Sequence, residues 1–305
     1  MKKDFMLYKR WNEDLAFAVA RLLVPALEED VAAPGDLTSL SLIAAEAKGQ
    51  TAVVARRPGV ICGLNAAAEI VRLSHKDLVW SPCCEDGQYI EAGDQVAELS
   101  GTVRDILGLE RIILNFIGRM SGIASKTNEY VKMVEGTSAR IYDTRKTLPG
   151  WRILDKYSVA KGGGHNHRLG LFDHILIKDN HLASSGEAGI TPGNAVLKAR
   201  NYLLTSGLYE EDQFPLIEIE VDTLDQLSDV LPANPDIVLL DNMGPDLLKK
   251  AVQMRDASNA SSELEASGGI NEKTILAIAQ SGIERISIGA LTHSVICFDV
   301  GLDWL

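Results

Sequence analysis

Short apolar runs recur through the second half of this 305-residue chain, and segments with helical spacing separate several of them. The segments TLDQLSDVL, PDLLKKAVQMRD and NEKTILAIAQSG carry apolar residues three and four positions apart, which is typical of amphipathic helices. Regular alternation of buried strands with helices predicts a parallel sheet. The predicted strands lie in RIYDTRK (140–146), HILIKDN (174–180), LIEIEV (216–221), DIVLLDN (236–242), ELEASGG (263–269) and RISIG (285–289).

The predicted strands finish in charged or glycine-rich residues at their C-terminal sides. These ends are Arg145-Lys146, Lys178-Asp179-Asn180, Glu220, Asp241-Asn242, Ser267-Gly268-Gly269 and Gly289. A β/α barrel builds its site from such strand ends and commonly holds phosphate in the loops after the last two strands. Here the last two ends carry glycines, whose backbone N–H groups can approach a phosphate closely. A barrel therefore fits the pattern better than an open doubly wound sheet.

The first 130 residues have a different pattern. Apolar residues broken by charges predict an amphipathic helix within segment 1–23, and APGDLTS (33–39) predicts a capped turn. TAVVARR (51–57) has the composition of a strand, and QVAELSGTVRDIL (95–107) predicts a strand, a turn and a second strand. Helical spacing from Glu110 to Glu135 predicts a helix that leads into the barrel.

This division predicts two domains. We expect an N-terminal α/β domain over residues 1–130 and a barrel domain over residues 131–293. The remaining tail, residues 294–305, is expected to pack back on the first domain.

Composition limits the class of protein further. Apolar residues make up 46% of the chain and charged residues 24%, as in ordinary globular proteins, and the net charge of −12 argues against nonspecific nucleic-acid binding. No apolar run approaches the roughly 18 to 20 residues that a membrane span needs. The four cysteines suit neither a zinc site nor a disulfide framework. We expect a soluble cytoplasmic protein without nucleic-acid or membrane partners.

One stretch has the opposite charge. Residues 140–181 hold eight Lys or Arg, four Asp and four of the six histidines, a net charge of +4 (eight minus four). A basic island in an acidic protein is typical of an anion site, although a solvated basic face has the same composition. The charges lie beside the triple glycine 162–164 and end apolar strands, which favours a site. The candidates are Arg145, Lys146, His167, Arg168 and Lys178.

Glu220 and Asp241 add two carboxylates to the same set of strand ends. Oxygen ligands of this kind suit Mg²⁺, which usually takes one or two carboxylates together with substrate phosphates. They can also neutralise Lys146 or Lys178, and the two roles are compatible. Glu218 precedes Glu220 by two residues and is expected to point the same way, one layer deeper.

Three further histidines, His165, His174 and His181, lie near the basic stretch. A zinc site needs three or four ligands with an ordered outer shell, and the spacing here supplies no nearby carboxylate. Orienting or hydrogen-bonding roles are therefore expected.

The segment DTRKTLPGWRILDKYSVAKGGGHNHRLGLFDHILIKDNHL (143–182) closely resembles the signature of the quinolinate phosphoribosyltransferase family, also called nicotinate-nucleotide pyrophosphorylase (carboxylating). The similarity covers nearly the whole chain in the expected order. It extends to GDLTS (35–39), RRPGVICGL (56–64), LERIILNFIGRMSGIAS (109–125), IEIEVDTLDQL (217–227), DIVLLDNM (236–243), LEASGGI (264–270) and ISIGALTHS (286–294).

The resemblance implies an N-terminal α/β-sandwich domain, an incomplete TIM-like α/β barrel, and a homodimer that completes each site across its interface. The implied reaction converts quinolinate and phosphoribosyl pyrophosphate to nicotinate mononucleotide, pyrophosphate and CO₂. It uses Mg²⁺ and belongs to de novo NAD biosynthesis.

The resemblance also implies residue roles. Quinolinate would contact Thr144, Arg145, His167, Arg168 and Lys178, and Arg111 from the partner subunit. The phosphoribosyl group and its phosphates would contact Lys146, Glu220, Asp241, Ser267, Gly268, Gly269, Ile288, Gly289, Ala290 and His293. Catalysis would fall to Lys146, Lys178, Glu220 and Asp241, with the two acids holding Mg²⁺ directly or through water.

Two features depart from the family pattern: the connection between Asn180 and Ile217 is long and polar, and Lys161 precedes the triple glycine. Neither affects a residue with an implied role. Three other interpretations remain open. They are a Schiff-base aldolase with Lys178 as nucleophile, a related branch linked to molybdenum utilisation, and a non-catalytic sensor of phosphorylated metabolites.

Overall fold

The computed structural model describes residues 8–185, 190–210 and 213–305. The chain forms two compact units. Unit 1 takes residues up to Glu129 together with Lys146–Asn166 and Ala290–Leu305, and unit 2 takes Tyr130–Arg145 and His167–Gly289. Each unit is therefore assembled from segments that are far apart in the sequence.

Unit 1 contains an antiparallel sheet whose edge strand comes from the C-terminus. The sheet has the order β12-β1-β5-β3. Its strands are β1 (Lys48–Ala55), β3 (Leu78–Pro82), β5 (Gln95–Thr102) and β12 (Val300–Trp304). The last of these pairs with β1 from Thr51↔Trp304 to Ala55↔Val300. A separate two-stranded ladder joins β2 (Gly59–Val60) to β4 (Tyr89–Ile90).

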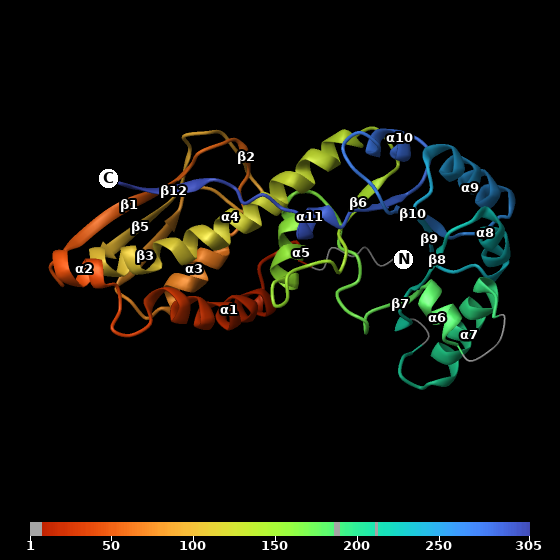
Figure 1. The fold of residues 1–305 in the computed structure, drawn as a ribbon, viewed down its shortest axis with the longest axis horizontal. Coiled ribbons are helices and arrows are strands. Elements are labelled where there is room, and N and C mark those ends of the chain that lie inside the picture. The colour runs from red at the N-terminus through yellow and green to blue at the C-terminus, as the bar shows by residue number, and fades with distance from the viewer. Residues whose placement is uncertain (1–7, 186–189, 211–212) are drawn as a thin grey trace. The chain divides into compact units, whose positions relative to one another are not determined.

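The helices of unit 1 are dominated by α4, which is 31 residues long. Its buried residues Ile106, Leu109, Ile113 and Ile117 recur at helical spacing and form an apolar stripe. Figure 1 shows α3 and α4 beside the sheet. Across the described ranges, no helix combines the length and the apolar composition that crossing a membrane requires. The helices are α1 (Glu13–Val31), α2 (Leu37–Leu42), α3 (Leu64–Leu73), α4 (Val103–Met133), α5 (Arg152–Lys161) and α11 (Ala290–His293).

Two predictions for this unit need correction. The segment VRDIL (103–107) was expected as a strand, but it forms the first turns of α4. The Thr102 hydroxyl donates a hydrogen bond to the Asp105 side chain in the first turn of the helix, and Ile106 is buried. The N-terminal helix begins later than expected, after the Asn12 cap, and continues to Val31. Residues 1–7 of that expectation lie outside the described residues.

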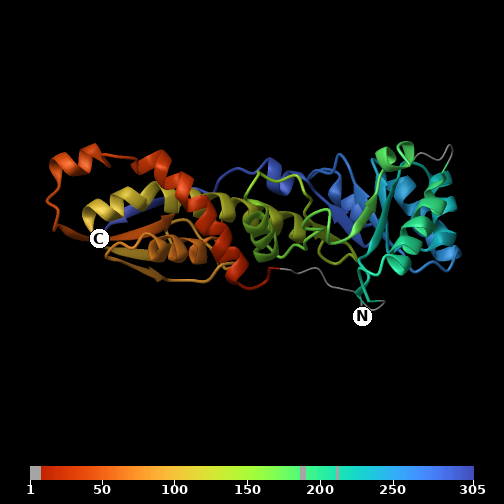
Figure 2. The ribbon, with the colours of Figure 1, turned by 90° about the horizontal axis from the view of Figure 1, so that it is seen from below.

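Unit 2 is built on a parallel sheet of six strands. All six strands match predicted runs: β6 (Arg140–Tyr142), β7 (Ile175–Ile177), β8 (Ile217–Val221), β9 (Ile237–Asp241), β10 (Glu263–Ser267) and β11 (Arg285–Ser287). The helices are α6 (Asp179–Ala183), α7 (Pro192–Thr205), α8 (Leu224–Val230), α9 (Pro245–Ala257), α10 (Ile275–Ala279) and the 3₁₀ turn η2 (Leu231–Ala233). Figures 1 and 2 both show α8 and α9 on the outer side of the sheet.

The strand order decides between an open sheet and a barrel. The order β6-β11-β10-β9-β8-β7 is cyclic, because the first strand of unit 2, β6, lies beside its last strand, β11, and each strand from β7 to β10 pairs with the next. Within the described residues, the pairing that would close the ring, β6 with β7, is missing. The predicted incomplete α/β barrel is therefore confirmed.

Candidate active site

The carboxyl ends of the unit 2 strands bring most of the predicted site residues to one edge of the sheet. Lys178 directly follows β7, Glu220 lies near the end of β8, and Asp241 and Ser267 end β9 and β10. Thr144 and Arg145 follow β6, while Gly268, Gly269, Ile288 and Gly289 follow the last two strands. His167 and Arg168 also belong to unit 2. The expected gathering of basic and acidic residues at strand ends is present within this unit.

Four predicted residues belong to unit 1. Arg111 is exposed on α4. The exposed Lys146 accepts a hydrogen bond from the Thr292 hydroxyl through its carbonyl, at 2.8 Å. Ala290 begins α11, and the exposed His293 has its Nδ1 2.6 Å from the Ser294 hydroxyl.

The acidic part of the site consists of Glu220 and Asp241. Lys178 forms an ion pair with Glu220, whose side chain is 13% exposed. Glu220 lies opposite Leu239 in the ladder, so Asp241, two residues further on, faces the same side of the sheet. The Asn242 amide donates a hydrogen bond to Asp241 at 2.6 Å. Both carboxylates are thus partly exposed oxygen donors on one face.

The loops after β9 and β10 contact each other through residues with left-handed backbone conformations. Gly268 and Gly269 have φ values of 85° and 62°, and Asn242 has a φ of 55°. The Asn242 N–H donates to the Ser267 carbonyl at 2.9 Å. A Cβ added at Gly268 would lie 2.1 Å from the Asn242 Oδ1 atom. This turn requires glycine and presents exposed backbone at a barrel mouth, which suits contact with a phosphate.

The end of β11 is tied to β6. The Ile288 N–H donates to the Tyr142 carbonyl at 3.0 Å, so this N–H already has a partner inside the barrel. Of the predicted phosphate-binding backbone, the exposed Gly268–Gly269 turn is therefore the better placed part.

Two arginines lie close together next to the end of β6. Burial lowers the pKa of Arg168, and the positive charge of neighbouring Arg145 lowers it further. The buried Asp143 carboxylate accepts the His167 N–H at 2.7 Å, which joins the segment before Arg145 to the segment before Arg168. A pair of like charges held together in this way is suited to a bidentate or dianionic ligand.

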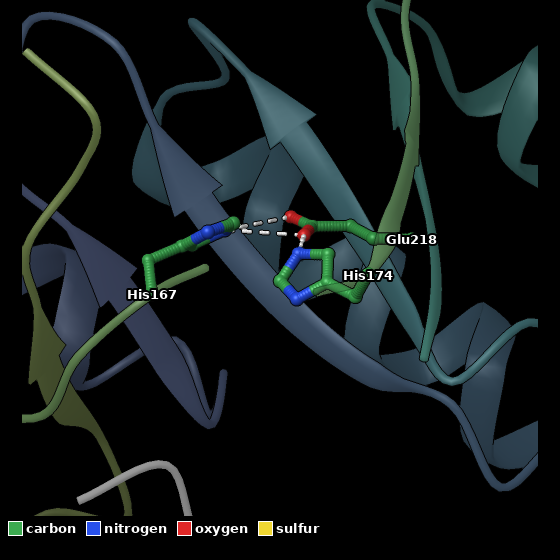
Figure 3. Close-up of side chains that lie close together, drawn as sticks. All are labelled: His167, His174 and Glu218. Atoms are coloured by element: carbon green, nitrogen blue, oxygen red, sulfur yellow. Dashed lines mark hydrogen bonds and ion pairs between the residues drawn. The ribbon is translucent and has the colours of Figure 1, made fainter. Parts of the chain in front are cut away.

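Below the mouth lies a buried cluster of His167, His174 and Glu218 (Figure 3). The Nε2 atom of His167 lies 3.2 Å from Glu218 Oε1 and 3.1 Å from Oε2. The Nε2 atom of His174 lies 3.1 Å from Oε2. Figure 3 shows both rings directed at the one carboxylate. Glu218 is fully buried, so it lies one layer deeper than Glu220, as the spacing predicted.

The cluster extends across the barrel to two further charged residues. Glu265 is fully buried, and its Oε1 atom lies 3.5 Å from His167 Nε2. Arg285 donates to Glu265 Oε2 at 2.7 Å, and its guanidinium carbon lies 3.7 Å from the centre of the Tyr142 ring. The interior therefore carries charged groups where barrels usually carry branched apolar side chains.

The ionisable groups in the cluster shift one another's pKa values. Burial alone would raise the pKa of Glu218, but the charge and hydrogen bonds of His167 and His174 outweigh it and hold that pKa well below its usual range. Burial alone would lower the pKa of His167, yet Glu218 and Glu265 raise it. For Arg285, burial is likewise outweighed by Glu265, which raises the pKa. Each buried carboxylate is thus stabilised by the donors beside it.

The hydrogen bonds assign the proton on the His167 ring. The Arg168 N–H donates to His167 Nδ1 at 2.8 Å, so this nitrogen acts as an acceptor and the proton lies on Nε2, facing Glu218. An imidazolium could not accept the Arg168 N–H. The raised pKa therefore reports how strongly the two carboxylates attract positive charge, while the geometry favours the Nε2–H tautomer.

The prediction from residue spacing did not include this cluster. We expected no carboxylate near the histidines, but Glu218 lies between two of them, and the ligand atoms of His167, His174 and Glu218 are within 4.8 Å of one another. Glu265 and Arg285 were not recognised as candidates either. The available signal was the alternation along strands. Glu265 precedes the mouth residue Ser267 by two positions and so points into the same interior, and Arg285 precedes Ser287, the last residue of β11, by two.

The sequence also matches two family models along most of its length. The model for the quinolinate phosphoribosyl transferase N-terminal domain matches residues 36–121, and the model for the C-terminal domain matches residues 123–303.

Similarity to individual known proteins agrees with these family matches. The chain is 38% identical over 295 residues to nicotinate-nucleotide pyrophosphorylase [carboxylating] of Mycobacterium leprae, covering 95% of this chain and 99% of that protein. It is 36% identical to a probable nicotinate-nucleotide pyrophosphorylase [carboxylating] of Bacillus subtilis, covering 88% of each. The structure of the nicotinate-nucleotide pyrophosphorylase from Francisella tularensis superposes with a TM-score of 0.86 at 36% identity, covering 97% of this chain and 98% of that one.

An incomplete parallel barrel with basic, acidic and glycine-bearing strand ends defines an α/β-barrel enzyme that binds anions. Together with the similarities above, it defines a phosphoribosyltransferase of the barrel type. The chain belongs to the quinolinate phosphoribosyltransferase family.

The turn at Gly268 provides a test of the mouth geometry. A Gly268→Ala substitution should lower the thermal stability, because a left-handed alanine costs about 1 to 2 kcal/mol and its Cβ would meet the Asn242 amide. Calorimetry would measure the change. Gly244→Ala is the matched control, since Gly244 has a φ of −74° and open space around its Cβ position. Equal melting temperatures for the two variants would contradict the described turn.

Proposed function

We propose that this protein catalyses the reaction of its family, in which quinolinate and phosphoribosyl pyrophosphate yield nicotinate mononucleotide, pyrophosphate and CO₂ in de novo NAD biosynthesis. The members that it matches are named for this carboxyl chemistry and for phosphoribosyl transfer. One observation carries the proposal for this chain: the Arg145–Arg168 pair and the acidic pair Glu220–Asp241 belong to the same barrel.

The arginine pair is proposed to hold quinolinate. Quinolinate is a planar dianion, and its carboxylates lose water when they enter the site, so several cations must replace that water. The guanidinium groups of Arg145 and Arg168 match carboxylates better than ammonium groups do, because they donate two parallel hydrogen bonds. His167, Thr144 and Lys178 complete the proposed contacts.

Glu220 and Asp241 are proposed to hold Mg²⁺. The residues fit the ion, since both are partly exposed oxygen donors on the same face of neighbouring strands, and Mg²⁺ usually takes one or two carboxylates together with substrate phosphates. When bound, Mg²⁺ would neutralise negative charge on the pyrophosphate. Lys178 already pairs with Glu220, so the acidic pair also serves to balance the basic one.

The chain's own groups suit the two chemical stages. Departure of pyrophosphate leaves oxocarbenium-like charge on the ribose and negative charge on the leaving group, which Lys146 is proposed to stabilise. The Gly268–Gly269 backbone is proposed to hold the 5′-phosphate. Decarboxylation follows when the quaternised ring nitrogen draws electrons from the adjacent carbon. The barrel then has to hold the ring and exclude water, and the two arginines are proposed to do the holding.

We further propose a homodimer in which Arg111 acts in the partner's site. Arg111 is exposed on α4 in unit 1, whereas Arg145, Arg168 and Lys178 belong to unit 2. An exposed arginine on a rigid helix is well suited to reach an anion bound by a second subunit.

A cytoplasmic location is proposed as well. All four cysteines are free thiols, which is typical of a reducing compartment. Nucleic acid and membrane are not expected among the partners of so acidic a chain.

The aldolase interpretation has weaker support. A lysine that forms an imine must be neutral, whereas the Lys178 ammonium forms an ion pair with Glu220. Borohydride in the presence of a carbonyl substrate should therefore leave no adduct on Lys178.

The reaction itself is tested by release of labelled CO₂ from carboxyl-labelled quinolinate. We expect release that depends on both phosphoribosyl pyrophosphate and Mg²⁺, that stops after chelation, and that returns when Mg²⁺ is added. Quinolinate alone is the control. Absence of release with both substrates and the metal present would refute the proposed function, and would favour the sensor or the molybdenum-linked branch.

The Arg145→Ala variant tests the quinolinate contact. Losing one partner of a desolvated charge pair costs about 2 to 5 kcal/mol, so the affinity for quinolinate should fall by at least roughly thirtyfold while the fold survives. Titration calorimetry would measure it. Arg255→Ala is the control, because Arg255 pairs with Glu284 and Asp256 away from the strand ends. Wild-type affinity in Arg145→Ala would show the assignment to be wrong.

Mixing variants tests the shared site. Arg111→Ala and Lys178→Ala should each be inactive, but in mixed dimers one site keeps both residues. Activity should recover to about a quarter of the wild-type value at random pairing. A mixture of Arg145→Ala with Lys178→Ala is the control. Arg145 and Lys178 are both proposed to act in the barrel of their own subunit, so in a mixed dimer each barrel lacks one of them and no site is restored. Heterodimers confirmed by mass spectrometry that remain inactive would count against the arrangement.

A further inference from the structure

The buried carboxylate of Glu218 has no role in the reaction as described so far. It accepts from His167 and from His174, and both rings point at it (Figure 3). It is fully buried, and it contacts the proposed quinolinate ligand His167 from the interior of the barrel. Removing a carboxylate from water is unfavourable, so the burial of Glu218 requires a structural or functional explanation.

A chain of hydrogen bonds leads from Glu218 to the arginine pair. Glu218 accepts from Nε2 of the His167 ring, and Nδ1 of the same ring accepts the Arg168 N–H at 2.8 Å. The backbone N–H of His167 in turn donates to Asp143 at 2.7 Å, two residues before Arg145. His167 therefore links two loops: its ring contacts the Arg168 backbone, and its own backbone contacts Asp143.

We propose that Glu218 is a positioning residue for quinolinate binding: it holds His167 as the Nε2–H tautomer, so that Nδ1 fixes the Arg168 backbone beside Arg145. This inference rests on the proposed function, because it concerns the arginines that would hold the two carboxylates. Glu218 itself touches no substrate.

His174 supplies the second constraint. Its Nε2 shares Oε2 of Glu218 with His167, and its carbonyl accepts from the Arg168 guanidinium at 3.4 Å. The same carboxylate thus orients the rings on both sides of the Arg168 segment. A glutamine at position 218 has one acceptor and one donor end, so it could satisfy one ring and would oppose the N–H of the other.

A metal ion could in principle occupy the same three residues, since their ligand atoms lie within 4.8 Å of one another. The contacts of 3.1 to 3.2 Å between ring nitrogens and carboxylate oxygens are hydrogen-bond distances. His167 also uses its other nitrogen as an acceptor, which is the pattern of a neutral donor ring rather than a ligand that donates outward. The hydrogen-bonded cluster without a metal is therefore preferred here, and the metal is an outcome to be tested.

The Glu218→Gln variant provides the kinetic test. We expect the KM for quinolinate to rise by at least about tenfold, because small displacements of binding groups are costly, while the KM for phosphoribosyl pyrophosphate changes by less than about twofold. Glu218→Asp keeps the charge and should recover part of the loss. A merely structural role would lower stability without separating the two KM values.

Asp155→Asn is the matched control. Asp155 is equally buried and pairs with Arg119 at 2.7 Å, but it lies in unit 1. It should lose stability with no selective change in the quinolinate KM. An unchanged quinolinate KM in a folded, active Glu218→Gln enzyme would overturn the proposal, whereas an inactive wild type would refute the proposed function instead.

Nitrogen NMR of the wild-type protein labelled at histidine gives a second test that needs no variant at position 218. The His167 signal, assigned by its loss in His167→Gln, should show a proton on Nε2 and a bare Nδ1. A proton on Nδ1 would overturn the inference. So would a stoichiometric transition metal in the purified protein, found by elemental analysis and absent from Glu218→Gln, because the cluster would then be a metal site.

Discussion

The compensation of charge inside the barrel is the constraint on which the rest of unit 2 depends. Glu218 and Glu265 are removed from water, and each such carboxylate is tolerable only with close donors. Arg285 and the two imidazole rings supply them. Removing any one partner would leave a buried charge exposed to a low dielectric, so the cluster is stable as a set. Its members lie on three different strands and the loop before β7, and they tie these parts together.

The mouth of the barrel carries both positive and negative groups. Arg145 and Arg168 lie so close that the charge of Arg145 lowers the pKa of Arg168. The carboxylates of Glu220 and Asp241 share one face of neighbouring strands. A ligand with a dianionic ring and a second ligand with a metal-bound pyrophosphate would each meet the opposite charge. The polarity of the site thus follows from which residues the strands place inward.

Much of this could be predicted from the sequence. The six strands of unit 2 are short apolar runs, and their polar ends identified the mouth, because parallel strands bring their carboxyl ends to one edge. The start of α4 was missed, since VRDIL has the composition of a strand and its helical register shows only when Ile106 is read together with Leu109 and Ile113. The buried cluster was missed because His174 and Glu218 are 44 residues apart. His174 directly precedes β7, which pairs with β8, so the contact depends on which strands become neighbours, and no local pattern encodes that.

The missing pairing of β6 with β7 within the described residues has a consequence for association between chains. Both strands that border it are only three residues long. Unpaired strand edges are templates on which other chains can add, and proteins commonly blunt them by keeping edge strands short. A barrel that does not close therefore still presents little backbone for edge-to-edge association.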